Sequence, residues 1–259
     1  MSAFAPEGTL PWVPLTGLAT ALTERGCAVV SATALCGALR TPPAALWAWN
    51  ALWDDLPPDA YLRDGGRYRR RRHACFVVAG EQVECMPHRP HWQPVAYNAL
   101  HGGLERWFEP LADSLVSQDL WAQLLTTLCA TCSQVKGPQP WYVEAHQFRI
   151  DTTDGIGRPT PEGAHRDGVD FVAVILVSRQ GIKGGETRVF EAEGPNGIRF
   201  TLSEPWTVLM MDDERVIHET TPIQPVEEVG HRDTLVLTFR RQGFQGPGAT
   251  EPDDATPAP

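Results

Sequence analysis

The segment Ala164-His165-Arg166-Asp167-Gly168 places an imidazole and a carboxylate two residues apart, and the rest of the chain can be read outward from it. In a β-strand, residues i and i+2 point to the same face, so His165 and Asp167 can both reach one metal ion. A second imidazole, His218, lies in a short alternating run that we expect to return on a neighbouring strand. These three side chains form a candidate metal site.

The ligand types narrow the choice of metal without settling it. Two imidazoles and one carboxylate on one face of an octahedral ion leave three positions open. Non-heme Fe(II) oxygenases use this ligand set, because they need open positions for a co-substrate and for O₂. A zinc hydrolase would more often combine three protein ligands with one water, so zinc stays open at this point.

A strongly β-type run, Arg232-Asp-Thr-Leu-Val-Leu-Thr-Phe239, follows the second histidine. Arg232 and Thr234 share a face of this strand. A guanidinium fork beside a hydroxyl suits a carboxylate that is held by two hydrogen bonds. His231 falls on the opposite face and Arg240 lies at the far end of the strand, so both are weaker candidates for this role.

Taken together, the motifs resemble those of the bacterial 2-oxoglutarate/Fe(II)-dependent dioxygenases that include free-amino-acid hydroxylases such as isoleucine 4-hydroxylase. The resemblance covers roughly residues 60–240. The pieces that carry it are Tyr68-Arg-Arg-Arg-Arg72, Tyr97-Asn98 with Gly102-Gly103, His146-Gln-Phe-Arg149, His165-x-Asp167, Gly184-Gly-Glu-Thr187, Asp213-x-Arg215-x-x-His218-x-x-x-Pro222-Ile223 and Arg232-x-Thr234.

The resemblance implies that His165, Asp167 and His218 bind Fe(II) and that Arg232 and Thr234 hold the far carboxylate of 2-oxoglutarate. It further implies O₂ as co-substrate, with ascorbate as the reductant in vitro. The implied activity is hydroxylation of an unactivated C–H bond of a small L-amino acid, aliphatic or cyclic, in natural product biosynthesis.

Three alternatives stay open. A related oxygenase would desaturate or sulfoxidise its substrate. A zinc or manganese enzyme on a cupin-like barrel would not need 2-oxoglutarate, and a binding module would have no activity.

The strand predicted over residues 142–150 supplies further candidates, because we expect it to line the cavity. Arg149 is a candidate for the α-carboxylate of an amino acid, and Gln147 for contact with the co-substrate. Glu144 and Asp170 are candidates for a substrate ammonium group. Which face of this strand points inward is not fixed by the alternation itself.

Two further segments are candidate parts of the substrate site. The arginine run Arg69–Arg72 enters an apolar β-type segment, so alternate arginines must point to opposite faces. We assign Arg70 and Arg72 to a substrate carboxylate, although the alternation allows Arg69 and Arg71 instead, and structural ion pairing is a further interpretation. Tyr97 is a candidate because the Pro- and His-rich segment before it reads as a loop that covers the site.

From Trp141 onward the hydrophobic period is two, and we expect strands near residues 142–150, 170–178, 186–191, 198–202, 206–212, 215–220 and 232–240. This pattern predicts an α+β, mainly β protein with a double-stranded β-helix core, a jelly-roll of the cupin-like type. We expect one domain over 1–259: a mostly helical part (1–140) packed on one face, the core with the metal site (141–241), and a disordered tail (243–259).

Composition excludes several classes of function. The chain has 259 residues, with 22 basic and 32 acidic side chains and a net charge of −10, which argues against nucleic acid as a partner. No segment approaches the roughly 18 apolar residues of a membrane span. The first residues lack the pattern of a secretory signal, and six cysteines are few for this length, so we expect a cytoplasmic protein. The N-terminal helices either pack on the barrel or pair two protomers in a homodimer.

Overall fold

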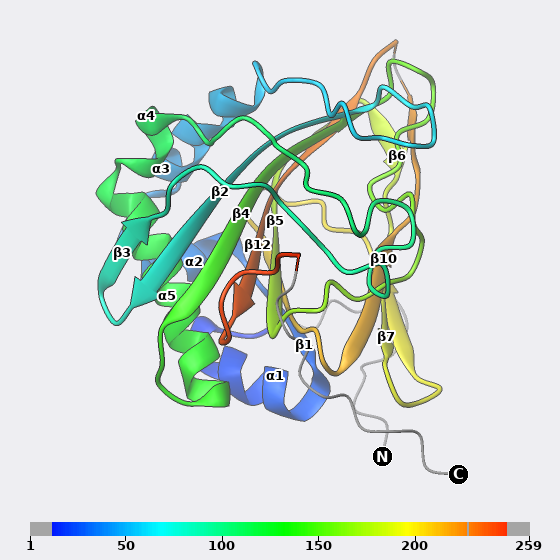
Figure 1. Ribbon diagram of the computed structural model, residues 1–259. Helices are drawn as coiled ribbons and strands as arrows, with labels where there is room; N and C mark the ends of the chain where they lie inside the picture. Colours follow the sequence, from blue (N-terminus) through cyan, green and yellow to red (C-terminus); the bar gives the residue numbers. More distant parts are fainter. Residues whose placement is uncertain (1–11, 227, 248–259) are drawn as a thin grey trace.

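A seven-stranded antiparallel sheet runs through the molecule (Figure 1), in the order β1-β9-β5-β12-β4-β2-β3. The computed structural model describes residues 12–226 and 228–247. The strands of this large sheet are β1 (Cys27–Val30), β2 (Arg69–Ala79), β3 (Gln82–Cys85), β4 (Trp141–Asp151), β5 (Phe171–Gln180), β9 (Val208–Asp212) and β12 (His231–Arg240). The long strands β4 and β12 pair along their whole length at its centre.

Smaller sheets face the large one (Figure 1). A three-stranded sheet has the order β10-β7-β8, and a two-stranded sheet joins β11 to β6. Their strands are β6 (Ile182–Gly184), β7 (Thr187–Glu191), β8 (Gly197–Phe200), β10 (Val216–Thr220) and β11 (Ile223–Pro225). The two opposed layers confirm the predicted double-stranded β-helix.

The helices cover the outer face of the large sheet (Figure 1). They are η1 (Leu15–Gly17), α1 (Leu18–Arg25), α2 (Ala32–Ala38), α3 (Pro43–Trp47), η2 (Ala48–Trp53), α4 (Asp113–Val116) and α5 (Asp119–Lys136), where η marks a 3₁₀-helix. The longest, α5, buries an apolar stripe that includes Trp121, Leu124 and Leu128. Among the described residues, no helix has both the length and the apolar content that crossing a membrane requires.

Side-chain alternation divides the central strands between two environments. On β12, Leu235, Leu237 and Phe239 belong to the core beneath the helices. Arg232 and Thr234, one register step away, point to the opposite side and line a cavity. Because successive residues of a strand face opposite ways, each long strand contributes to both the core and the cavity.

The N-terminal half departs from the predicted mostly helical part. Strands β1, β2 and β3 all precede residue 140, so helices and strands are not separated there. Helix α3 begins at Pro43, and its N-cap residue Pro42 makes no side-chain cap bond.

The C-terminal segment is also different from the prediction. The tail predicted to be disordered begins at residue 243, and its residues 248–259 lie outside the described part of the chain. Gln245 is buried, and its side-chain Nε2 donates hydrogen bonds to the backbone oxygens of Asp167 (3.2 Å) and Gly168 (2.8 Å). The prediction of disorder is therefore wrong at Gln245, where these two carbonyl acceptors fix the chain.

Substitution of Trp121 by alanine should destabilise the fold strongly, because its fully buried ring packs between Trp49 and Phe76. We expect a loss of about 3–5 kcal/mol in the free energy of unfolding, measured by urea denaturation. Trp47→Ala is the matched control, since Trp47 is 53% exposed, and should change this value by no more than about 0.5 kcal/mol. Equal effects of the two substitutions would contradict the helix-on-sheet core described above.

Candidate metal and co-substrate site

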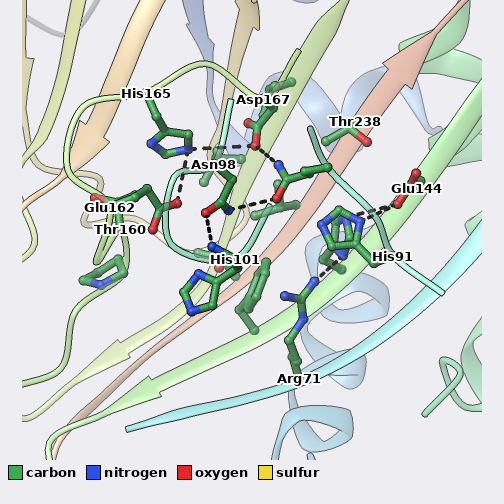
Figure 2. A pocket seen from close by; sticks show the side chains of 18 of the residues that line it. Arg71, His91, Asn98, His101, Glu144, Thr160, Glu162, His165, Asp167 and Thr238 are labelled. Atoms are coloured by element: carbon green, nitrogen blue, oxygen red, sulfur yellow. Dashed lines mark hydrogen bonds and ion pairs between the residues drawn. The ribbon is translucent and has the colours of Figure 1, made fainter. Parts of the chain in front are cut away.

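The cavity lies inside the barrel, between the large sheet and β10, and has a volume of about 130 Å³. Figure 2 shows His165, Asp167 and Glu162 on one side of it and Arg71, His91 and Glu144 on the other. A volume of this size holds on the order of ten water molecules. The cavity therefore suits small molecules.

The three predicted metal ligands meet on the first side of the cavity. One donor atom from each of His165, Asp167 and His218 lies within 4.8 Å of the others. The Nε2 atom of His218 is 3.3 Å from Asp167 Oδ2, and that of His165 is 3.8 Å from Asp167 Oδ1. This cluster of two imidazoles and one carboxylate fits a divalent metal ion with open coordination positions.

The backbone around these ligands is not the regular strand that the i, i+2 spacing suggested. His165 forms an isolated antiparallel bridge to His218, and it does not belong to a continuous strand. Gly168 adopts a left-handed conformation (φ 72°), which ends the extended run. The two ligands therefore converge through an irregular turn.

Asp213 holds this turn in place. Its Oδ1 accepts a hydrogen bond from the backbone nitrogen of Asp167 (3.1 Å), and its Oδ2 accepts from Gly168 (2.8 Å) and Val169 (3.1 Å). Burial, together with the nearby Asp167 carboxylate, raises the pKa of Asp213 to about 6. Three backbone donors on one buried carboxylate fix the segment that carries the ligands.

The orientation of His165 is set by its second nitrogen. Nδ1 donates to the backbone oxygen of Gly163 (2.9 Å), so Nε2 is the ring nitrogen left to bind a metal ion. Glu162 Oε1 lies 3.6 Å from this Nε2, and its other oxygen has no hydrogen-bond partner among the described residues. The hydrogen bond to Gly163 thus sets the orientation in which the ring presents Nε2 to the cavity.

The side chain of Arg232 has the properties needed to bind a carboxylate of 2-oxoglutarate. Its side chain is 3% exposed, and neither Nε nor Nη2 has a hydrogen-bond partner within the described chain. Burial and the neighbouring Arg179 lower the pKa of Arg232 to about 10, which leaves it protonated at neutral pH. A buried unpaired cation is costly unless an anion joins it. Thr234 lines the same cavity and adds a neutral donor for a bound carboxylate.

The arginines of β2 that face the cavity are not the pair that we assigned from the sequence. Arg69 and Arg71 line the cavity. Arg70 instead lies 3.5 Å from Asp151, and Arg72 pairs with Glu109 at 2.9 Å. The assignment of Arg70 and Arg72 is wrong, because the register with β4 turns these two side chains outward.

The alternation along β4 likewise turns Gln147 and Arg149, the two candidates on its other face, away from the cavity. Gln147 donates to the backbone oxygen of Leu52 (3.4 Å) beneath the helices, and Arg149 pairs with Asp233 at 2.8 Å. Neither residue lines the cavity. Their predicted contacts with co-substrate and substrate are therefore wrong, since even-numbered residues of β4 face inward.

Asp170 and Tyr97 also lie outside the cavity lining. Asp170 pairs with Arg241 at 2.6 Å. The ring of Tyr97 occupies the space where a side chain on Gly168 would lie, so it supports the ligand turn and does not face the cavity. The expected roles of both residues in substrate contact are wrong.

Glu144, by contrast, lies on the far wall of the cavity within a cluster of imidazoles (Figure 2). Its Oε2 is 2.9 Å from His73 Nε2 and 2.7 Å from His91 Nδ1. Burial alone would raise the pKa of Glu144, but His91 and His73 hold this pKa well below its usual range. The carboxylate is therefore ionised, and both imidazole nitrogens donate to it.

This second cluster of three histidines and Glu144 does not suit a metal ion, although its donor atoms lie close together. His146 Nδ1 is 2.7 Å from Arg71 Nη2, and a guanidinium can only donate. His146 therefore carries its proton on Nε2, the atom that would face a metal. Burial lowers the pKa of all three imidazoles, and the neutral rings of His73 and His91 donate hydrogen bonds to Glu144.

The comparisons with known proteins agree with this geometry. A model of the 2OG-Fe dioxygenase family matches residues 50–238. The chain belongs to this family. No curated protein sequence matches the chain.

Among solved structures, a bsmA homologue from Methylobium petroleophilum PM1 is 51% identical, with a TM-score of 0.87 over 93% of this chain and 98% of that one. IDO from Bacillus thuringiensis is 16% identical, with a TM-score of 0.72 over 92% and 99% of the two chains. The Fe(II)/α-ketoglutarate-dependent dioxygenase TqaL is 19% identical, with a TM-score of 0.68 over 88% and 87%. The last two support the fold alone.

Membership in this family establishes Fe(II), 2-oxoglutarate and O₂ as the cofactor and co-substrates. Once bound, they supply the oxidising chemistry. His165, Asp167 and His218 would hold the metal, and Arg232 would pair with the co-substrate carboxylate.

Replacing Arg232 by methionine should weaken 2-oxoglutarate binding about tenfold to a hundredfold, since a hydrogen bond to a charged group contributes about 1.5–3 kcal/mol. Calorimetric titration of the Mn(II)-loaded protein without O₂ measures this affinity. Arg240→Met is the matched control on the same strand, because Arg240 bonds to the backbone oxygen of Gly243 and does not line the cavity. A loss of affinity in the Arg240 variant alone would contradict the assignment.

The imidazole cluster should make the fold sensitive to acid. Burial lowers the pKa of His91 to about 3 and also lowers the pKa of His73 and of His146. In the unfolded chain the pKa of a histidine is about 6.5. Below that pH the unfolded chain binds more protons than the folded chain, so the free energy of unfolding falls. Between pH 7.5 and 5.5 we expect a fall of about 1 kcal/mol per imidazole in urea denaturation. Equal or greater stability at pH 5.5 would contradict this assignment of neutral imidazoles.

Proposed function

We propose that this protein hydroxylates an unactivated C–H bond of a small free L-amino acid, in the biosynthesis of a specialised metabolite. One observation carries the proposal: the cavity wall across from the metal ligands carries both positive and negative charge. It places the guanidinium groups of Arg71 and Arg106 beside the Glu144 carboxylate. An α-amino acid carries the two complementary charges on one carbon.

The cationic half of this wall suits a substrate carboxylate. Arg71 lies between two aromatic rings, 3.9 Å from the centroid of Phe108 and 4.3 Å from that of Phe148, which fix the plane of its guanidinium. The Nε atoms of Arg71 and Arg106 have no hydrogen-bond partner in the described chain. Fixed, incompletely paired guanidinium groups favour a planar anion.

The anionic half suits a substrate ammonium group. Oε2 of Glu144 accepts from both His73 and His91, while Oε1 makes no hydrogen bond to the described residues. Since His91 donates through Nδ1, its Nε2 keeps a lone pair. Glu144 and His91 both line the cavity and thus offer two acceptors beside the arginines.

Part of the cavity lining is apolar. Val172 and Val174 of β5 and Val236 of β12 line it. These side chains favour an aliphatic or cyclic substrate side chain. Such a substrate would present a C–H bond to the metal centre, in keeping with the sequence resemblance to free-amino-acid hydroxylases.

The test is 2-oxoglutarate turnover by purified protein with Fe(II), ascorbate and O₂. Succinate is measured against a panel of free L-amino acids, and mass spectrometry searches for a product heavier by one oxygen atom. We expect one small aliphatic or cyclic amino acid to stimulate succinate formation. Asp167→Ala should abolish turnover.

Glu144→Gln provides a more specific variant, because it keeps the shape of the side chain and removes the charge that faces the ammonium group. It should raise the KM for the amino acid at least tenfold and leave the slow turnover without substrate in place. If no amino acid stimulates turnover while slow succinate formation persists, the substrate proposal is wrong and the family chemistry stands. A product lighter by two hydrogen atoms would instead indicate desaturation.

A further inference from the structure

Gln93 connects the cationic wall to a metal ligand. Its Oε1 accepts hydrogen bonds from Arg106 Nη2 (2.9 Å) and from Asn98 Nδ2 (3.0 Å). Its Nε2 donates to Asp167 Oδ1 (3.1 Å). The side chain is 6% exposed and comes from the loop between β3 and α4, far in sequence from the metal ligands.

The orientation of the Gln93 amide is determined by its partners. A guanidinium nitrogen cannot accept a hydrogen bond, so the atom facing Arg106 must be the oxygen. The atom facing Asp167 is then the amide nitrogen, which suits a carboxylate oxygen. Arg106 is 2% exposed, and its charge strengthens the polarity of the amide that it contacts.

The loop itself is built to hold Gln93 rigidly. The backbone nitrogen of Gly103 donates to the Gln93 carbonyl oxygen (2.8 Å), and that of Gly102 donates to the Asn98 carbonyl oxygen (2.7 Å). A side chain on Gly102 would collide with the backbone of this turn. Gln93 is therefore fixed at both its main chain and its side chain.

Both oxygens of Asp167 border the metal-binding nitrogens. Oδ2 is 3.3 Å from His218 Nε2, and Oδ1 is 3.8 Å from His165 Nε2. With no other partner, both oxygens could bind the same ion and occupy two of its positions. The Gln93 hydrogen bond engages Oδ1, whereas among the described residues Oδ2 contacts only the candidate ligand His218 (3.3 Å).

We propose that Gln93 is a positioning residue that restricts Asp167 to one metal-binding oxygen. The third open position is then kept for the chelating co-substrate and O₂, which together need all three. This inference rests on the assignment of His165, Asp167 and His218 as ligands, and not on the identity of the substrate. Removal of a side chain that hydrogen-bonds to a metal ligand typically costs about 10–100-fold in metal affinity or activity.

The test compares wild type with Gln93→Met, which keeps the length of the side chain and removes the amide. Mn(II) binding and 2-oxoglutarate binding to the Mn(II)-loaded protein are each measured by calorimetry without O₂. We expect the Kd for Mn(II) to change less than threefold and the Kd for 2-oxoglutarate to rise about 10–100-fold. Gln93→Leu provides the same comparison if the methionine variant does not fold.

A second measurement reports on the coordination itself. The visible spectrum of the Co(II)-loaded protein without 2-oxoglutarate should differ between wild type and Gln93→Met, because a second carboxylate oxygen changes the coordination of the ion. Gln134→Met is the matched control, since Gln134 is exposed on α5, and it should leave the spectrum and both Kd values unchanged.

Several results would overturn the inference. Unchanged 2-oxoglutarate affinity with an unchanged Co(II) spectrum would show that Asp167 does not depend on Gln93. A parallel fall in Mn(II) affinity, 2-oxoglutarate affinity and thermal stability would assign Gln93 a loop-supporting role only. Failure of wild type to bind Mn(II) would overturn the ligand assignment and this inference together. No amino acid enters these measurements, so an incorrect substrate proposal would not affect them.

Discussion

The two-residue alternation of the long central strands is the constraint on which the rest of the structure depends. On β12 it sends Leu235 and Leu237 into the core beneath the helices and Arg232 into the cavity. A shift of one residue in the register would bury the charge among the helices and expose the leucines to the cavity. The hydrophobic core therefore fixes where the Arg232 guanidinium lies in the cavity, and the stability of the fold and the geometry of the site depend on the same strand register.

Charge inside the barrel is arranged in two separate groups. In the cavity that the metal ligands also line, Arg232 is a buried cation whose Nε and Nη2 have no hydrogen-bond partner in the described chain, which favours an added anion. On the far wall, Glu144 is ionised and already held by neutral imidazoles. A bound anion would complete the first group, whereas the Glu144 carboxylate already has two hydrogen-bond donors. This difference explains why only one of the two histidine clusters suits a metal ion.

The sequence predicted the fold class and most strands of the core, because alternation and turn residues are local signals. It also placed Arg232 and Thr234 on one face, which the structure turns toward the cavity. Alternation does not reveal which face is inward, and so Arg149 was assigned wrongly although its strand was predicted correctly. Gln93 and Arg106 could not be recognised as cavity residues, because they lie in a long irregular loop without any periodicity.

A structure determined with bound Mn(II) and 2-oxoglutarate, using anomalous diffraction to locate the metal, tests the central claim most directly. The account predicts one ion bound by His165, Asp167 and His218, with the far carboxylate of 2-oxoglutarate paired to Arg232. An ion within the cluster around Glu144, or a co-substrate carboxylate on Arg71 with Arg232 left unpaired, would contradict it.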